Sequence, residues 1–85
     1  MRGLGAVSPT EAEIIRLPPA FSPRETDCMV RLVRGLTDQE IARDLAITHA
    51  TVRFHLEGAR RKAGARSRTH LAALAVALGV ATPYP

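Results

Sequence analysis

Residues 37–64, TDQEIARDLAITHATVRFHLEGARRKAG, predict two short helices joined by a tight turn. Thr37 and Glu40 have the spacing of a capping box, in which a hydroxyl and a carboxylate bond the free amides at a helix start. Thr48 is placed to cap the second helix, and Gly64 to end it in the left-handed conformation. Apolar residues of the second helix recur along one stripe: Val52, Leu56, Ala59 and Ala63. This stripe predicts a buried face opposite an exposed one.

Three more helices are expected around this unit. Ser22-Pro23-Arg24-Glu25 predicts the start of a core helix ending near Gly35, and Ser67 is placed to cap a final helix over about 67–80. Ser8-Pro9-Thr10-Glu11 similarly predicts a short amino-terminal brace helix. We therefore expect an all-α fold, with a flexible lead and brace over 1–20, a four-helix domain over 21–81 and a frayed tail over 82–85.

Composition restricts the possible functions. The 85 residues, 46% hydrophobic and 24% charged, suit one small soluble domain. The single cysteine, Cys28, excludes an internal disulfide and a Cys-based zinc site, and is expected to be a buried apolar residue in a reducing cytoplasm. The start of the chain lacks a signal-peptide pattern, and the apolar run Leu71–Ala81 is shorter than a membrane span. We expect a cytoplasmic protein without a cofactor, metal, membrane partner or catalytic centre.

Positive charge is concentrated in the second half of the chain. The formal net charge is +4, and residues 48–85 hold five Arg and one Lys against one acid, Glu57. A basic surface of this kind attracts nucleic acid first and acidic membranes second.

Residues 21–80 resemble the LuxR-type helix-turn-helix domain of bacterial transcription regulators. The matching motifs are Ser22-Pro23-Arg24-Glu25, Gly35-Leu36-Thr37, Glu40-Ile41-Ala42, Leu45, Ile47-Thr48, Thr51-Val52-Arg53 with His55, Lys62 and Arg66-Ser67-Arg68-Thr69. A weaker similarity, carried by residues 17–21 and 56–62, is to region four of sigma factors. The apolar last helix favours the LuxR-type resemblance, because the sigma module needs no such dimerising helix.

The resemblance implies a domain that binds double-stranded DNA, and we expect the chain to be a stand-alone, sequence-specific transcription regulator. Its recognition helix, about 48–63, would enter the major groove, and its last helix would form a homodimer. Residues expected to contact DNA are Thr48, His49, Thr51, Arg53, Phe54, Glu57, Arg61, Lys62 and Arg66, with Thr51 and Lys62 on phosphates, Arg53 and Phe54 toward the groove, and Arg66 on the flanking backbone. Residues expected at the dimer interface are Leu71, Leu74, Ala75 and Leu78.

Several side chains have two interpretations. Glu57 can pair with Arg53 or Arg61, or accept a hydrogen bond from cytosine N4. His49 can reach a phosphate or remain in solvent. His55 can pack at the edge of the buried stripe or read a base, and the packed role is favoured. His70 is expected to be structural.

Two small residues depart from the family pattern, and a second function remains open. Ala46 stands in the turn where many relatives have Gly, and Gly58 lies inside the recognition helix, where Gly costs roughly 0.5 to 1 kcal/mol. The alternative function is a protein-interaction module that docks on a larger regulator or on RNA polymerase with weak or no DNA binding.

Overall fold

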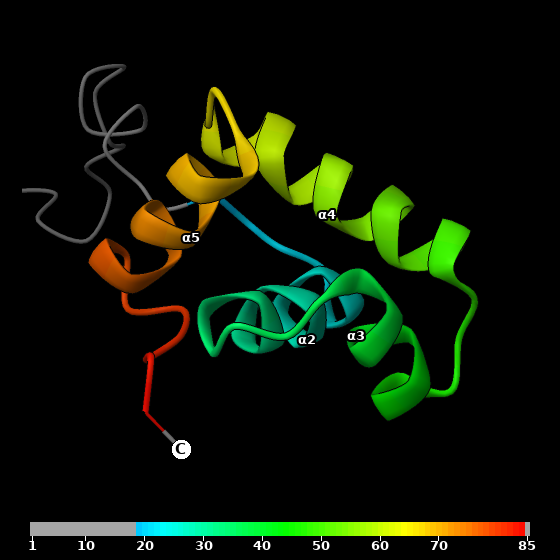
Figure 1. Cartoon of the computed structure of the whole chain (residues 1–85). Helices are drawn as coiled ribbons and strands as arrows, with labels where there is room; N and C mark the ends of the chain where they lie inside the picture. Colours follow the sequence, from blue (N-terminus) through cyan, green and yellow to red (C-terminus); the bar gives the residue numbers. More distant parts are fainter. Residues whose placement is uncertain (1–18, 85) are drawn as a thin grey trace, which may run out of the picture.

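The computed structural model describes residues 19–84, and this part of the chain contains four helices and no strand. Figure 1 shows helices α2 (Pro23–Val33), α3 (Asp38–Leu45), α4 (His49–Ala63) and α5 (Arg68–Ala77). The all-α expectation is confirmed. The predicted brace helix after Ser8 lies outside the described residues. No helix within residues 19–84 is long and apolar enough to cross a membrane.

Each helix begins after the hydroxyl residue that the sequence indicates. The four caps accept hydrogen bonds from the amide three residues later: Ser22 at 3.1 Å, Thr37 at 3.2 Å, Thr48 at 3.1 Å and Ser67 at 3.1 Å. The carboxylates of Glu25 and Glu40 each accept the cap amide in return, at 2.8 Å. Both capping boxes therefore form as predicted, and local hydrogen bonding sets the helix starts.

The turn between α3 and α4 places an alanine in the left-handed region. Ala46 has φ 56° and ψ 43°, and it follows directly on the end of α3. The amide of Ile47 donates to the carbonyl of Ala42 at 3.0 Å and so closes the helix end. Gly64 ends α4 in the same conformation, at φ 68°, as expected. An alanine at such a position carries a steric cost that glycine avoids.

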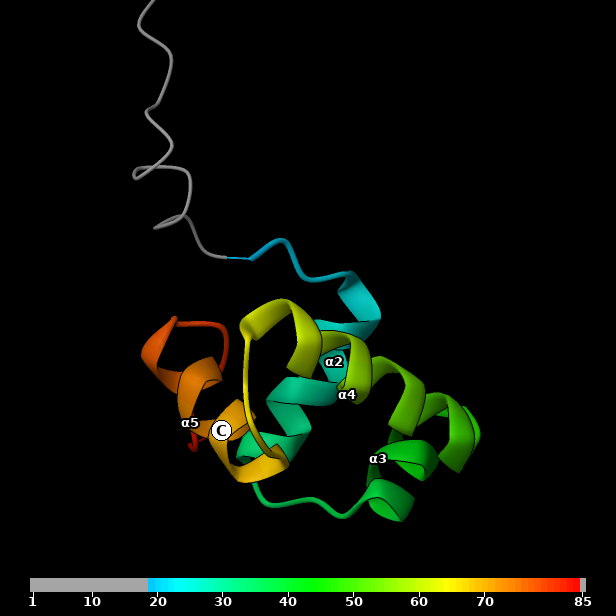
Figure 2. The ribbon, with the colours of Figure 1, turned by 90° about the horizontal axis from the view of Figure 1, so that it is seen from above.

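The core lies where α4 crosses α2 and α3 and where α5 packs against α2 and α4 (Figures 1 and 2). Val52, Leu56 and Ala59 are buried along α4 as predicted, whereas Ala63, the fourth member of the predicted stripe, is only partly buried against the core. They pack with a cluster drawn from the other helices, which includes Cys28, Met29, Ile41, Ala42, Leu71 and Ala75. Because three helices cover one side of α4, its opposite side is open to solvent.

A buried carboxylate also joins α2 to α4. Glu25 is 7% exposed, and its Oε1 accepts hydrogen bonds from the Ser22 amide and from Lys62 Nζ, each at 2.8 Å. Gly58 provides the space for this group, because a Cβ there would lie 2.6 Å from Glu25 Oε2. Burial alone raises the pKa of Glu25, but the hydrogen bonds from Lys62 and Ser22 together with the Lys62 charge hold it below its ordinary value.

Ala46→Gly is expected to raise the free energy of unfolding by about 1 kcal/mol, because glycine adopts the left-handed conformation without the Cβ cost. Urea denaturation measures the change. The matched control is Ala50→Gly in the exposed face of α4, which should lower stability by roughly 0.5 to 1 kcal/mol. A loss of stability in Ala46→Gly would contradict the strain assigned to this turn.

Gly58→Ala is expected to lower the free energy of unfolding by about 1 kcal/mol, although the same change in most helices stabilises. The new methyl would force the Glu25 carboxylate away from Lys62 and Ser22. In a Glu25→Ala background this obstacle is gone, so Gly58→Ala should then be stabilising. Denaturation of the two single variants and the double variant tests the coupling, and additive effects would refute it.

Candidate nucleic-acid interface

The open side of α4 combines positive charge with one large apolar ring. Arg53, Phe54, Glu57 and Arg61 are all exposed, and the Phe54 side chain is 70% exposed. Within residues 19–84 Arg53 has no ion-pair partner, and it borders a cleft of about 220 Å³ whose apolar lining is Leu56 and Leu71. The guanidinium of Arg53 is therefore available to an external acceptor.

Glu57 is held by basic neighbours on its own helix. Its two oxygens accept from Arg60 Nε at 2.8 Å and Arg60 Nη2 at 2.7 Å, and Arg61 Nη1 lies 3.6 Å away. The hydrogen bond from Arg60 holds the pKa of Glu57 below its ordinary value. Arg60 also donates to the Ala65 carbonyl at 2.9 Å. The pairing interpretation of Glu57 describes this geometry: the expected partner Arg61 lies within ion-pair distance, and Arg60, which was not expected, is the closer partner.

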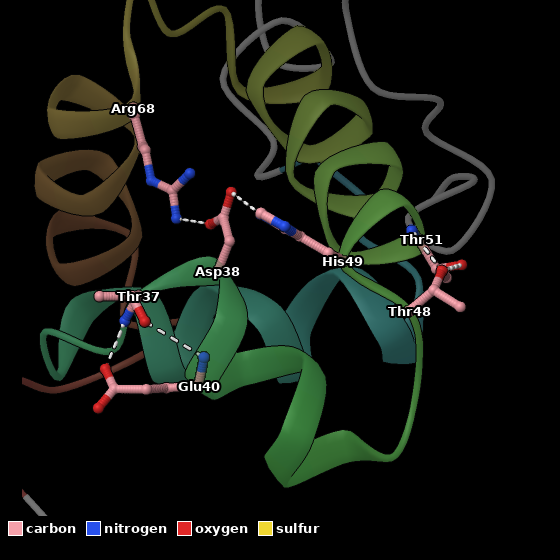
Figure 3. Close-up of polar contacts among 7 residues, drawn as sticks. All are labelled: Thr37, Asp38, Glu40, Thr48, His49, Thr51 and Arg68. Atoms are coloured by element: carbon pink, nitrogen blue, oxygen red, sulfur yellow. Dashed lines mark hydrogen bonds and ion pairs between the residues drawn. The ribbon is translucent and has the colours of Figure 1, made fainter.

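Asp38 joins the starts of three helices. Its Oδ1 accepts from Arg68 Nη2 and its Oδ2 lies 3.4 Å from His49 Nε2, so α3, α4 and α5 meet at one carboxylate (Figure 3). The hydrogen bond from Arg68 is the main cause that lowers the pKa of Asp38. His49 thus has a protein partner that neither of its sequence interpretations included. Sequence reasoning missed this role of Asp38, because its partners lie 11 and 30 residues away.

Lys62 directs its charge into the protein. Its Nζ donates to Glu25 at 2.8 Å and to the Ala20 carbonyl at 3.4 Å. The sequence placed this residue on a DNA phosphate, but its ammonium already satisfies a buried acid. The Lys62 side chain is nevertheless 43% exposed, so its contact with a DNA phosphate stays a prediction.

The remaining polar residues of the predicted site lie at the two ends of α4. The hydroxyls of Thr48 and Thr51 are 2.7 Å apart at its start. Beyond its end, Arg66 is exposed, and its amide donates to His70 Nδ1 at 2.9 Å. This bond shows the structural role expected of His70. His55 is half-buried, with its ring edge to Phe54 at a centroid distance of 5.5 Å.

Two residues predicted for a dimer interface lie inside the protomer. Leu71 and Ala75 are each 1% exposed because they pack in the core against α2 and α4. This burial corrects their assignment to an intermolecular surface. Leu74 is half-buried, Leu78 is 39% exposed, and Val76, which the sequence did not single out, is 43% exposed.

No cluster of three His, Cys, Asp or Glu side chains suited to a metal occurs in the described part of the chain. Cys28 is fully buried, and burial raises the pKa of its thiol. The thiol is therefore packed and protonated, as expected for a core residue.

Comparison with known proteins assigns the fold to a family. Residues 19–75 match the family described as bacterial regulatory proteins, luxR family. The chain belongs to the LuxR family. This membership confirms the helix-turn-helix resemblance and agrees with the arrangement of α3 and α4.

LuxR-family relatives of this chain are named as transcription regulators. It is 39% identical over 64 residues to the transcriptional activator protein AhyR of Aeromonas hydrophila, covering 75% of this chain and 25% of AhyR. It is 36% identical over 69 residues to the regulatory protein SdiA of Escherichia coli K12, covering 80% of this chain and 29% of SdiA. The chain thus spans about a quarter of the length of these curated relatives.

A solved LuxR-type structure has the same fold. The VqmA dimer of Vibrio cholerae, described as a LuxR-type receptor in the absence of its target DNA, superimposes with a TM-score of 0.70 at 26% identity. The match covers 91% of this chain and 40% of the VqmA chain.

Lys62→Met is expected to lower the free energy of unfolding by about 1 to 3 kcal/mol near pH 7, because it leaves the Glu25 carboxylate buried without its cation. The pKa of Glu25 is held below 4.5 in the folded chain, so this contribution is full above that value and is lost as pH falls through the folded pKa. Urea denaturation from about pH 7 to about pH 2 should show the two proteins converging in acid. The control is Arg61→Met, one residue earlier on the exposed face. It should change the free energy of unfolding little at about pH 7 or about pH 2. A pH-independent difference would contradict the pairing.

Proposed function

We propose that this LuxR-family chain is the DNA-binding unit of a bacterial transcription regulator, and that α4 enters the major groove. The observation that carries the proposal is the open face of α4, where Arg53 has no acidic partner within residues 19–84. A major groove about 12 Å wide accepts one helix, and arginine is the side chain that most often reads guanine through two hydrogen bonds. Arg53 is the proposed reader.

The ends of α4 suit the phosphate backbone on either side of the groove. Thr48, His49 and Thr51 lie at the positive end of the helix, where hydroxyls and amides bind anions. Arg61 and Arg66 supply charge near the other end. These contacts would position the helix without reading sequence. Lys62 can add a phosphate contact as well, because its side chain is 43% exposed and its ammonium has a third N–H donor beyond those that contact Glu25 and Ala20.

We further propose that residues 21–81 act as one domain and that two copies bind as a homodimer. Leu74 and Val76 of α5, with Leu78 at the cap that follows it, provide large apolar side chains that are exposed or half-exposed. An inverted repeat with half-sites about one helical turn apart would follow from twofold symmetry. The VqmA protein is described as a dimer that has a target DNA, and this description supports the same expectation here.

The second candidate function is docking on a larger regulator or on RNA polymerase. The apolar residues Val76 and Leu78 favour it, because an exposed apolar surface suits a protein partner. We propose no catalytic activity, and a family of transcription regulators agrees with that view.

The decisive experiment is a fluorescence titration of the chain against randomised duplex DNA at low and moderate salt. Binding that weakens as salt rises is expected, because phosphate contacts release counterions. Absence of binding at low salt would reject the proposal and leave the docking function.

Arg53→Ala is expected to weaken binding to a selected cognate duplex by about 1 to 3 kcal/mol and to change binding to random duplex little. Arg34→Ala is the matched control, because Arg34 is exposed but lies just after α2, away from α4. Titration of each variant with cognate and random duplex gives the two affinities. Equal losses on both duplexes would show that Arg53 contributes charge and not sequence reading.

A further inference from the structure

Phe54 is an apolar ring at the centre of the proposed reading face. It is 70% exposed, whereas the other phenylalanine, Phe21, packs against the core. On α4 it lies two residues from Val52 and from Leu56, both of which are buried. At about 100° per residue, this spacing turns the ring away from the core and toward the open side.

The surroundings of the ring leave its outer surface uncovered. His55 contacts it edge-on at an interplanar angle of 69°. Ala50, one turn earlier, has only a methyl group, and Glu57, almost one turn later, is drawn toward Arg60 by two hydrogen bonds. The ring is therefore open to a partner on this face, and it has no polar atom with which to form a hydrogen bond.

We propose that Phe54 recognises thymine by contacting its 5-methyl group. Among the four bases, thymine alone presents an apolar group in the major groove, and phenylalanine is one of the side chains that match it. This inference rests on the proposed function, because it requires α4 in the groove. The flanking arginines Arg53 and Arg61 favour a phosphate-lined surface over an apolar protein groove as the partner.

If Phe54 contacts the 5-methyl group, replacing that thymidine by deoxyuridine should weaken binding. Deoxyuridine keeps every hydrogen-bonding group of thymidine and lacks only the methyl. Removing one buried methyl from an apolar contact weakens binding roughly fourfold. The loss should occur at one thymine of each half-site and not at the others.

The experiment uses the full chain and a duplex selected from a random pool. Each thymine is replaced in turn by deoxyuridine, and affinity is measured by fluorescence titration for the unmodified chain and for Phe54→Ala. The wild-type chain should bind the duplex with deoxyuridine at the contacted thymine roughly fourfold more weakly than the duplex with thymine there. The Phe54→Ala variant should bind these two duplexes equally. Arg61→Ala is the control, because it should weaken both duplexes alike and keep their ratio.

Two results would overturn the recognition of thymine by Phe54 and leave the proposed function standing. In one, the unmodified chain tolerates deoxyuridine at every position. In the other, the loss persists in Phe54→Ala. Phe54 is exposed, so its truncation leaves the core intact, and circular dichroism verifies the fold of the variant. Failure of the unmodified chain to bind any duplex would reject the proposed function together with this reading of thymine.

Discussion

The buried carboxylate of Glu25 is the interaction on which the position of α4 depends. Taking a carboxylate out of water is costly unless its oxygens are satisfied and its charge is paired. The Ser22 amide, at the cap of α2, donates a hydrogen bond to the carboxylate, and Lys62 of α4 supplies the pairing charge. Gly58 is the matching gap in α4, because any larger residue would displace the acid. One side chain thus caps a helix and sets how a second helix lies on it.

Ion pairing within the protein also divides the basic residues of α4, α5 and the loop between them into two groups. Arg60, Lys62 and Arg68 each bond a carboxylate within the protein, namely Glu57, Glu25 and Asp38. Arg53 and Arg66 have no such partner among the described residues. Formal charge therefore overstates the number of cations that lack an acidic partner within the protein. In the proposed recognition of DNA, Arg53 of the second group and the uncovered ring of Phe54 are the residues that would read bases.

Packing also divides α5, which the sequence describes as apolar throughout. Leu71 and Ala75 turn inward to α2 and α4, so they stabilise the protomer itself. Its large apolar residues that stay exposed are Val76 and, at the cap that follows the helix, Leu78. A surface for a second copy or for another protein is accordingly narrower than the run Leu71–Ala81 indicates. Which residues of this run are exposed depends on which face of α5 packs against the core.

The sequence by itself determined the helix starts, most of the buried stripe of α4, the left-handed end at Gly64, and the exposed placement of Arg53 and Phe54. These features depend on hydrogen bonds and side-chain directions within one or two helical turns, which the local residue pattern encodes. Only the tertiary structure decided that Lys62 pairs with Glu25, 37 residues away, and Arg68 with Asp38, 30 residues away. Such pairs form between whichever charges the packed helices bring together, and charge alone does not reveal the partner.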